Sequence, residues 1–266
     1  MRIRISKGLN NLLSYIYILI IYIFMLLPLV VVIIGSFNSA VSFPSPFKSF
    51  TLRWYEALLH HDEFLRSIWV STEIAISAAT IATLFGIPVS MLLVRKDIPG
   101  KDLINGFFMT PLIIPEIAAG LAILQMFSMF HIKSSLAGLI AVHVVFITPY
   151  IIRAVTSTLI FFDMSLEEAG MNLGAGRLRV FFLITLPLIK SGVSAGFILA
   201  FIISFINVGL SLFLSSPMFT TLPIRIFAHL ESRLDPIIAA VGSIIILGVS
   251  IIVVFVDKFL KVRLIM

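Results

Sequence analysis

The chain has 266 residues, of which 60% are apolar and only 12% are charged, whereas a soluble domain is about 45–50% apolar and about 25% charged. Its mean hydropathy is +1.15. These values exclude a disordered chain, a collagen-like fibre and a soluble globular domain, and they leave a polytopic integral membrane protein. The absence of cysteine excludes disulfides, thiolate nucleophiles and cysteine metal sites. A net charge of +6 is typical of the Lys/Arg excess in cytoplasmic membrane-protein loops, so we expect no nucleic-acid partner.

Six apolar runs determine the expected fold class. Each is longer than the ~20 residues that an α-helix needs to cross the hydrocarbon core, whereas β-barrel strands would be shorter and would alternate in polarity. We therefore predict an all-α membrane protein with six transmembrane helices in a single domain, residues 1–266. The predicted spans are residues 13–36, 67–94, 103–130, 135–160, 183–214 and 236–257.

Six spans place both termini on the same side of the membrane. If the termini are cytoplasmic, thirteen of the 19 Lys and Arg residues fall in inner segments and six in outer segments. This excess predicts cytoplasmic termini, because inner loops are enriched in Lys and Arg. The first run follows basic residues, as a signal peptide does, but it is longer than the typical h-region of about 7–15 residues. We therefore interpret it as an uncleaved first helix.

The segment between the fourth and fifth spans carries the strongest local signal. Ser165 and Glu168 have the Ser-x-x-Glu spacing of a capping box, which predicts a helix that begins at Ser165. Glu167 and Glu168 suit the positive end of the helix dipole, and Gly174 is a suitable C-terminal stop. Such a helix, within about residues 163–176, either lies on the membrane surface or docks into a groove of a partner. Its small apolar face would consist of Leu166, Ala169, Gly170 and Leu173.

The same segment resembles the EAA signature of ABC importer permeases. Glu168-Ala169-Gly170 is followed after three residues by Gly174, and after nine more by Ile184-x-Leu186-Pro187. The signature reads E-A-A, three residues, G, nine residues, I-x-L-P, so the spacing matches throughout and only Gly170 departs from it. In this family the short helix couples the membrane subunit to the ATPase. The resemblance therefore implies coupling roles for Glu167, Glu168, Ala169, Gly170 and Gly174.

Further segments look like the spermidine/putrescine permease branch of that family, so the resemblance covers most of the chain. It favours a polyamine-like solute, although related branches carry iron, phosphonates or other small solutes. One departure weakens the case for a cation. The branch often has an acidic residue after Ser-Phe in the fifth span, where this chain has Ser204-Phe205-Ile206-Asn207. The similar segments are Ser36-Phe37-Asn38, Phe50-Thr51-Leu52-Arg53-Trp54-Tyr55, Pro111-Leu112-Ile113-Ile114-Pro115-Glu116 and Thr221-Leu222-Pro223.

The resemblance implies a type I ABC importer permease in the lipid of a bacterial inner membrane. The implied partners are a second permease subunit, two ATP-binding cassette subunits and a periplasmic substrate-binding protein. Alternating access would be driven by the ATPase subunits, so we expect no enzymatic activity, cofactor or metal site in this chain. The sequence lacks a G-x-x-x-x-G-K-[ST] phosphate loop, since Gly100-Lys101 is followed by Asp102. The alternative is a self-sufficient secondary transporter or channel, which leaves the 165–174 helix without a purpose.

Polar residues inside two predicted spans are candidates for the translocation pathway. Glu116 lies near the middle of the third span, where Pro111 and Pro115 remove backbone donors and can break the helix. A carboxylate there is expected to face either a cavity or a neighbouring helix, because exposure to lipid is costly. In the fifth span, three polar residues share one helical face, which either lines the pathway or forms interhelical hydrogen bonds: Ser204, Asn207 and Ser211.

The sequence Gly192-Val193-Ser194-Ala195-Gly196 matches the G-x-S-x-G nucleophile pattern, which works on a strand-to-helix turn. Here the pattern begins an apolar helix, and His143, a conceivable base, has no evident acidic partner. A ladder of small residues at four-residue spacing runs through the same helix and allows close helix approach. We therefore interpret the pattern as a packing feature, not a hydrolase site. The ladder consists of Gly192, Gly196, Ala200 and Ser204.

Overall fold

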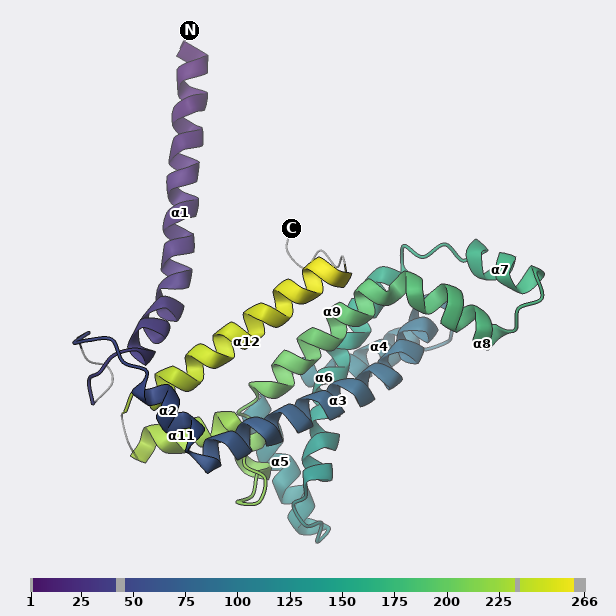
Figure 1. Cartoon of the computed structure of the whole chain (residues 1–266). Helices are drawn as coiled ribbons and strands as arrows, with labels where there is room; N and C mark the ends of the chain where they lie inside the picture. Colours follow the sequence, from purple (N-terminus) through teal and green to yellow (C-terminus); the bar gives the residue numbers. More distant parts are fainter. Residues whose placement is uncertain (1, 42–45, 233–234, 261–266) are drawn as a thin grey trace. The chain divides into compact units, whose positions relative to one another are not determined.

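The computed structural model describes residues 2–41, 46–232 and 235–260, and most of these residues are helical (Figure 1). A membrane span favours helix because all of its backbone polar groups must be bonded within the segment. The elements in chain order are α1 (Arg2–Ser36), α2 (Arg53–Leu59), α3 (Asp62–Arg95), α4 (Lys101–Met109), η1 (Thr110–Leu112), α5 (Glu116–Met129), α6 (Leu136–Leu159), α7 (Ser165–Asn172), α8 (Arg177–Val180), η2 (Phe181–Thr185), α9 (Leu186–Phe205), α10 (Ser211–Leu214), α11 (Leu222–Ser232) and α12 (Ile237–Leu260).

The chain divides into two compact units, and each is described by itself. Unit 1 comprises residues 1–62 and 229–250, and unit 2 comprises residues 63–228 and 251–266. In unit 1, the Tyr55 hydroxyl of α2 lies 2.7 Å from the Ser36 hydroxyl of α1 and 2.7 Å from the Ser243 hydroxyl of α12. This polar contact ties three helices of unit 1 together. The expectation of one domain over the whole chain remains a prediction.

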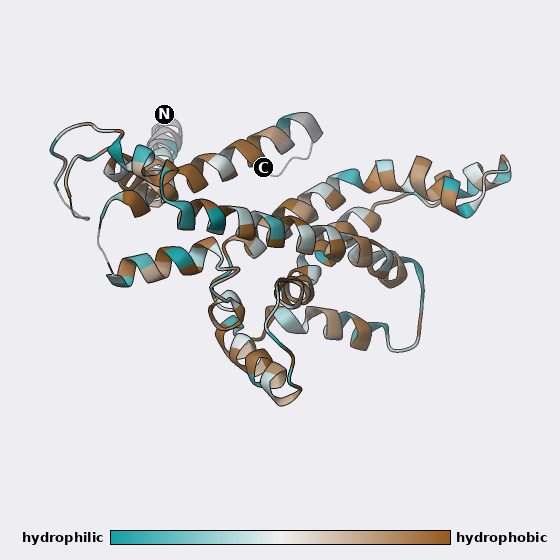
Figure 2. Cartoon of the chain, turned by 60° about the horizontal axis from the view of Figure 1, so that its bottom comes forward, coloured by the Kyte–Doolittle hydropathy of each residue, from teal (hydrophilic) through white to brown (hydrophobic). Residues whose placement is uncertain are grey.

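The membrane-spanning helices agree with the predicted fold class. Within the described residues, five helices are long and apolar enough to cross a membrane, and a bent pair makes a sixth span if the two helices count as one. Figure 2 shows apolar residues along most of the long helices. The five helices are Leu13–Ser36, Asp62–Arg95, Leu136–Leu159, Arg177–Phe205 and Ile237–Phe255, and the pair is Lys101–Leu112 with Glu116–Met129.

The third span is broken where its prolines predict. The segment formed by α4 and η1 meets α5 at an angle of 97°. Pro115 stands immediately before α5 with φ −59° and ψ 121°, outside the helical conformation. Proline donates no backbone hydrogen bond and disfavours helix at the residue before it. The break makes Glu116 the first residue of α5.

The fifth span is shorter than predicted. Helix α9 ends at Phe205, residues 206–210 are irregular, and α10 is a separate short turn. The prediction of a helix over 183–214, with Ser204, Asn207 and Ser211 on one continuous face, is therefore wrong. The Asn207 Oδ1 accepts a hydrogen bond from the Leu210 backbone N–H at 3.0 Å. Such a local side-chain bond competes with helical hydrogen bonding, and hydropathy does not detect it.

Helices α3, α6 and α9 form the main core of unit 2. The most extensive contact joins α6 to α9, and the small-residue ladder of α9 is buried as predicted. A Cβ atom on Gly192 would lie 2.6 Å from the Ala154 carbonyl oxygen of α6, so this position requires glycine. The G-x-S-x-G pattern therefore serves helix packing. The surrounding buried side chains are Ala78, Ala79, Ala82, Ile147, Ile151, Val155, Ile189 and Ala200.

Candidate functional site

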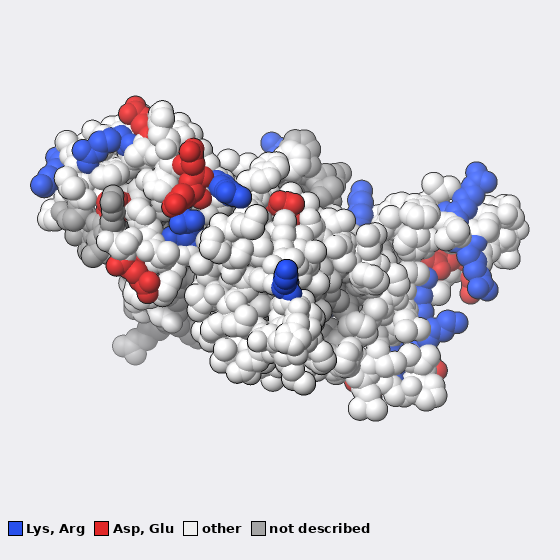
Figure 3. All heavy atoms as spheres, turned by 90° about the horizontal axis from the view of Figure 1, so that it is seen from below, with Lys and Arg blue, Asp and Glu red and all other residues white. Residues whose placement is uncertain are grey.

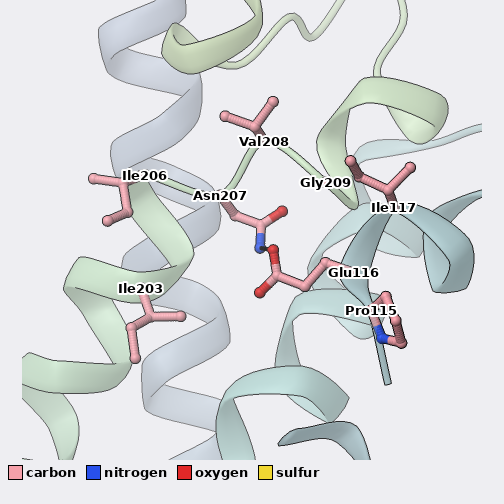
Figure 4. A pocket seen from close by; sticks show the side chains of 8 residues that line it. All are labelled: Pro115, Glu116, Ile117, Ile203, Ile206, Asn207, Val208 and Gly209. Carbon is pink, nitrogen blue, oxygen red and sulfur yellow. Dashed lines mark hydrogen bonds between the residues drawn. The ribbon is translucent and has the colours of Figure 1, made fainter. Parts of the chain in front are cut away.

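The breaks in the third and fifth spans meet in space (Figure 4). The Asn207 Nδ2 donates a hydrogen bond to the Glu116 Oε2 at 2.9 Å. Between α9 and α10, Gly209 allows this approach, because a Cβ atom there would lie only 2.6 Å from the Glu116 Cβ. The two interruptions therefore form one junction, held by a carboxylate–amide hydrogen bond.

A cavity of about 570 Å³ opens at this junction. Its lining side chains are apolar apart from the Glu116 carboxylate and the Asn207 amide, which point toward each other in Figure 4. Glu116 is half-buried. Since an amide carries no charge, the hydrogen bond from Asn207 brings no positive charge to the Glu116 carboxylate. The lining residues are Pro115, Glu116, Ile117, Ile203, Ile206, Asn207, Val208 and Gly209.

The two serines predicted to share the pathway face do not line this cavity. Ser204 and Ser211 are buried, and both hydrogen-bond to the imidazole of His143 in α6. The Ser204 hydroxyl lies 2.7 Å from Nδ1, and the Ser211 hydroxyl lies 3.3 Å from Nε2. The serines therefore flank the irregular segment 206–210 and hold it to α6. From the sequence, His143 was considered only as a conceivable base without an acidic partner, and the break that brings it two partners was not foreseen.

Helix α7 begins at Ser165, as predicted, but the predicted capping box does not form. No side chain caps α7 from its first residues. Instead the Asp163 Oδ1 accepts a hydrogen bond from the Ser165 N–H at 3.0 Å. This backbone bond, with a further contribution from the Ser165 side chain, lowers the pKa of Asp163 below its ordinary value. The Glu168 N–H, from which the Ser165 hydroxyl would accept a hydrogen bond in a capping box, bonds instead to the Met164 carbonyl at 3.3 Å.

The C-terminal end of α7 confirms the role predicted for Gly174 as a helix stop. Gly174 has φ +87°, in the left-handed region. Its N–H bonds to the Met171 carbonyl at 2.9 Å, and the Ala175 N–H bonds to the Gly170 carbonyl at 3.1 Å. These two bonds are those of a Schellman motif. A Cβ atom on Gly174 would meet nothing within 4 Å, so the glycine presents a bare, exposed backbone.

The small apolar face predicted for α7 is divided between the interior and the surface. Leu166 and Ala169 are exposed, and Leu173 is 90% exposed. Gly170 packs inward, where a Cβ atom would lie 2.7 Å from the Ile184 Cδ1. This contact gives a physical reason for glycine at the position where the E-A-A pattern has its second alanine.

The two glutamates of α7 have different surroundings. Glu168 is exposed, whereas Glu167 is buried. Arg95 donates from both terminal nitrogens to the Glu167 carboxylate, at 2.7 Å and 3.0 Å, and the Thr185 hydroxyl donates to it as well. Sequence reasoning missed Arg95 and Thr185. Arg95 was counted only as an inner-loop cation, and Thr185 lies inside an apolar run.

Charged side chains are unevenly distributed over unit 2. Figure 3 shows Lys, Arg, Asp and Glu gathered at the end that carries α7 and α8, at the right of the view, and few charges along the middle. Arg177 and Arg179 of α8 belong to this end. A stretch of surface with few charges is typical of a segment embedded in lipid.

Comparisons with known proteins also indicate a membrane protein, and they identify its family. Residues 82–265 match the family model described as "Binding-protein-dependent transport system inner membrane component". The chain is 30% identical to the spermidine/putrescine transport system permease protein PotC of Escherichia coli K12, over 85% of each chain. It is 35% identical to the putrescine transport system permease protein PotI of the same strain, over 91% of this chain and 88% of the relative.

A solved structure also shares the fold. A bacterial ABC transporter involved in the import of the acidic polysaccharide alginate contains a chain that matches with a TM-score of 0.71 at 14% identity. The match covers 96% of this chain and 97% of the other. The family match, the two permease relatives and the apolar helices together show a multi-pass membrane protein with the type I permease fold. The chain belongs to the binding-protein-dependent transport system inner membrane components, the permease subunits of ABC importers.

Proposed function

We propose that this permease carries a polyamine-like cation through the pocket at Glu116 and Asn207. The observation that carries the proposal is the half-buried Glu116 carboxylate, set in an otherwise apolar cavity where two broken spans meet. The relatives named as spermidine/putrescine and putrescine permeases support the same solute class. A polyamine joins ammonium groups by methylene chains, which suits one carboxylate among isoleucine side chains.

The third span supplies an acidic residue in place of the one that the fifth span lacks. The polyamine branch often has an acidic residue after Ser-Phe in the fifth span, whereas this chain has Ile206 and Asn207 after Ser204-Phe205. This departure weakened the case for a cation. Glu116 reaches the same pocket from α5 and lies 2.9 Å from the Asn207 amide. A carboxylate is therefore present at this place, although another helix supplies it. We infer that the exchange retains an attraction for ammonium groups.

The same chemistry disfavours the other solute classes. A phosphonate anion would be repelled by Glu116, because like charges in a low-dielectric site interact strongly. Iron is bound by several imidazole, carboxylate or thiolate ligands, and this pocket offers one carboxylate and one amide. An ammonium group needs only a carboxylate and room for its apolar chain.

We further propose how the assembly is built. A second permease subunit completes the pathway, a periplasmic substrate-binding protein delivers the solute, and two ATP-binding cassette subunits hydrolyse ATP. Helix α7 docks into an ATPase subunit through Glu168, Ala169 and its exposed leucines, and Gly174 permits close approach. ATP-driven movement of α7 then switches the spans between inward-open and outward-open states. The basic residues near α7 support a cytoplasmic position for this end and for both termini.

The direct test is transport by the purified assembly. The chain is expressed with its co-purifying partners, reconstituted in proteoliposomes and supplied with labelled putrescine. We expect uptake that requires ATP and the binding protein, and that unlabelled spermidine but not a phosphonate inhibits. Uptake without the ATPase subunits would support a self-sufficient transporter instead. ATP-dependent uptake of an anion in preference to putrescine would refute the cation assignment.

A further inference from the structure

Glu167 differs from its neighbour Glu168 in its exposure and in its bonding partners, the two properties that decide whether a side chain can bind a partner subunit. The two acids are adjacent in the sequence, Glu168 begins the signature, and both were predicted to couple the chain to the ATPase. Glu168 is exposed. The side chains of Arg95 and Glu167 are only 14% and 11% exposed. A carboxylate that is already bonded inside its own chain offers little to a partner's surface.

We propose that Glu167 is a positioning residue that, with Arg95 and Thr185, anchors the coupling helix to the transmembrane bundle. The anchor transmits the movement of α7 to α3 and to the beginning of the fifth span. This inference rests on the proposed function, because it assumes that α7 receives movement from an ATPase.

The geometry of the anchor suits the transmission of force. Arg95 is the last residue of α3 and binds Glu167 through both terminal nitrogens. A guanidinium–carboxylate pair with two parallel bonds fixes orientation as well as distance. The Arg95 guanidinium also lies 5.3 Å from the centre of the Phe162 ring, within the range of a cation–π interaction. Helix α7 is therefore held against rotation and translation relative to α3.

Thr185 connects the same carboxylate to the fifth span. It is the last residue of η2, a π-helical turn that leads directly into α9, and its hydroxyl donates to the Glu167 Oε1. Turns of this kind occur frequently at functional sites. Since α3 and α9 both belong to the core around α6, displacement of Glu167 acts on two helices of one packed bundle.

The remaining contacts of α7 are mostly with chain that follows it directly. Gly170 packs against Val180 and Ile184, and the main backbone contacts of α7 are with α8 and η2. Arg95 lies 72 positions from Glu167 in the sequence. Without this long-range link, α7 and α8 could move as a local arm while α3 stayed in place.

The test measures coupling in the complete reconstituted assembly. Arg95→Gln and Glu167→Gln are each compared with wild type for putrescine uptake, ATP hydrolysis and melting temperature of the complex. We expect the number of solute molecules transported per ATP to fall by about fivefold or more, because one partner of a buried ion pair is left without its counter-charge. Basal ATP hydrolysis per assembled complex should persist, because the exposed docking face is unchanged.

Two further variants keep the test decisive if a single replacement impairs assembly. The charge-exchanged pair Arg95→Glu with Glu167→Arg should recover at least about half of the lost coupling ratio, because opposite charges again face each other. Thr185→Val keeps the ion pair and the side-chain shape, and it should lower the ratio only by about twofold, the effect of one neutral hydrogen bond.

A second ion pair of unit 2 provides the matched control. The Arg225 guanidinium bonds to the Glu63 carboxylate at 2.8 Å, and Glu63 is exposed. Arg225→Gln and Glu63→Gln should leave the coupling ratio unchanged, because exposed pairs contribute little.

The inference is refuted if Arg95→Gln and Glu167→Gln reduce only the amount or the melting temperature of the complex while each assembled complex keeps the wild-type ratio. It is also refuted if the charge-exchanged pair recovers nothing while the complex assembles. Failure of the proposed function looks different, because the wild-type assembly would then show no ATP-dependent putrescine uptake at all.

Discussion

The pocket at Glu116 and the anchor formed by Glu167, Arg95 and Thr185 both contain a hydrogen-bonded glutamate, but the two glutamates have different surroundings. In each, a glutamate on one helix accepts a hydrogen bond from a nitrogen donor on another segment, at 2.9 Å from Asn207 to Glu116 and at 2.7 Å from Arg95 to Glu167. The Glu116 donor is a neutral amide beside an open cavity. The Glu167 donors are a guanidinium and a hydroxyl. We propose that the first carboxylate keeps its charge available to a solute, whereas the second is paired with a guanidinium and holds helices together.

The largest effect is expected at the end of the coupling helix. Gly174→Asp should abolish transport while the subunit still inserts, because the added charged side chain blocks the close approach of the ATPase. The chain itself has room for the side chain, since a Cβ atom there meets nothing within 4 Å. Uptake in proteoliposomes and the amount of subunit in membranes are measured together.

Gly100 provides a closely matched control for this substitution. It also has a positive φ, +77°, and open space around its Cβ position, but it precedes α4 and not the coupling helix. Gly100→Asp should therefore retain most transport. Equal loss in both variants would show that backbone strain, not docking, explains the effect.

At the pocket, Glu116→Gln should lower putrescine uptake by about tenfold, because a charge-assisted contact is worth roughly 1.5–3 kcal/mol more than none. Gln preserves the shape and still accepts the Asn207 hydrogen bond, so the melting temperature should change little. Uptake rate and melting temperature are measured on the same preparation. Unchanged putrescine uptake would contradict the role of Glu116 as the cation-attracting group.

Asn207→Leu should produce a smaller loss of uptake, by about threefold to tenfold, together with a lower melting temperature. Asn207 both lines the pocket and satisfies the Leu210 N–H, and an unsatisfied buried donor costs about 1–3 kcal/mol. Ser204→Ala is the comparison, because Ser204 is buried away from the pocket and bonds to His143. It should lower the melting temperature and leave uptake per complex intact. A full loss of uptake in Ser204→Ala would indicate that Ser204 belongs to the translocation pathway after all.

The smallest effect is expected at Asp163, which begins the turn into α7. Because its pKa is lowered in the folded protein, its contribution is fully present above the pKa of the unfolded chain and is lost as the pH falls through the lowered folded pKa. At neutral pH, Asp163→Ala should change the coupling ratio by less than about twofold, since only one exposed turn is affected. A loss as complete as in Gly174→Asp would show that Asp163 itself contacts the ATPase.

Much of the fold could be predicted because hydropathy reports membrane burial directly. The apolar spans, the break at Pro111 and Pro115 and the helix stop at Gly174 follow from composition, proline chemistry and helix-end preferences. These signals are local, and each depends on residues within a few positions.

The site could be predicted only in part because its geometry depends on breaks and long-range partners. The early end of α9 depends on the hydrogen bond from the Leu210 backbone N–H to the Asn207 side chain. Hydropathy along an apolar run does not reveal this bond. The capping box does not form, because the Glu168 N–H bonds to the Met164 carbonyl instead. The partners of Glu167 and His143 come from distant helices, so a single sequence offers no spacing that would reveal them.

If the third span supplies the carboxylate that a cation requires at this pocket, the two polar residues Glu116 and Asn207 should be exchangeable. Glu116→Gln combined with Asn207→Asp moves the carboxylate to the fifth span without adding or removing a charge. ATP-dependent putrescine uptake is compared among wild type, Glu116→Gln and this double variant in the reconstituted assembly. We expect the double variant to recover most of the uptake that Glu116→Gln loses, because a carboxylate again faces the same cavity. Uptake in the double variant as low as in Glu116→Gln, with the complex fully assembled, would contradict this role of the carboxylate.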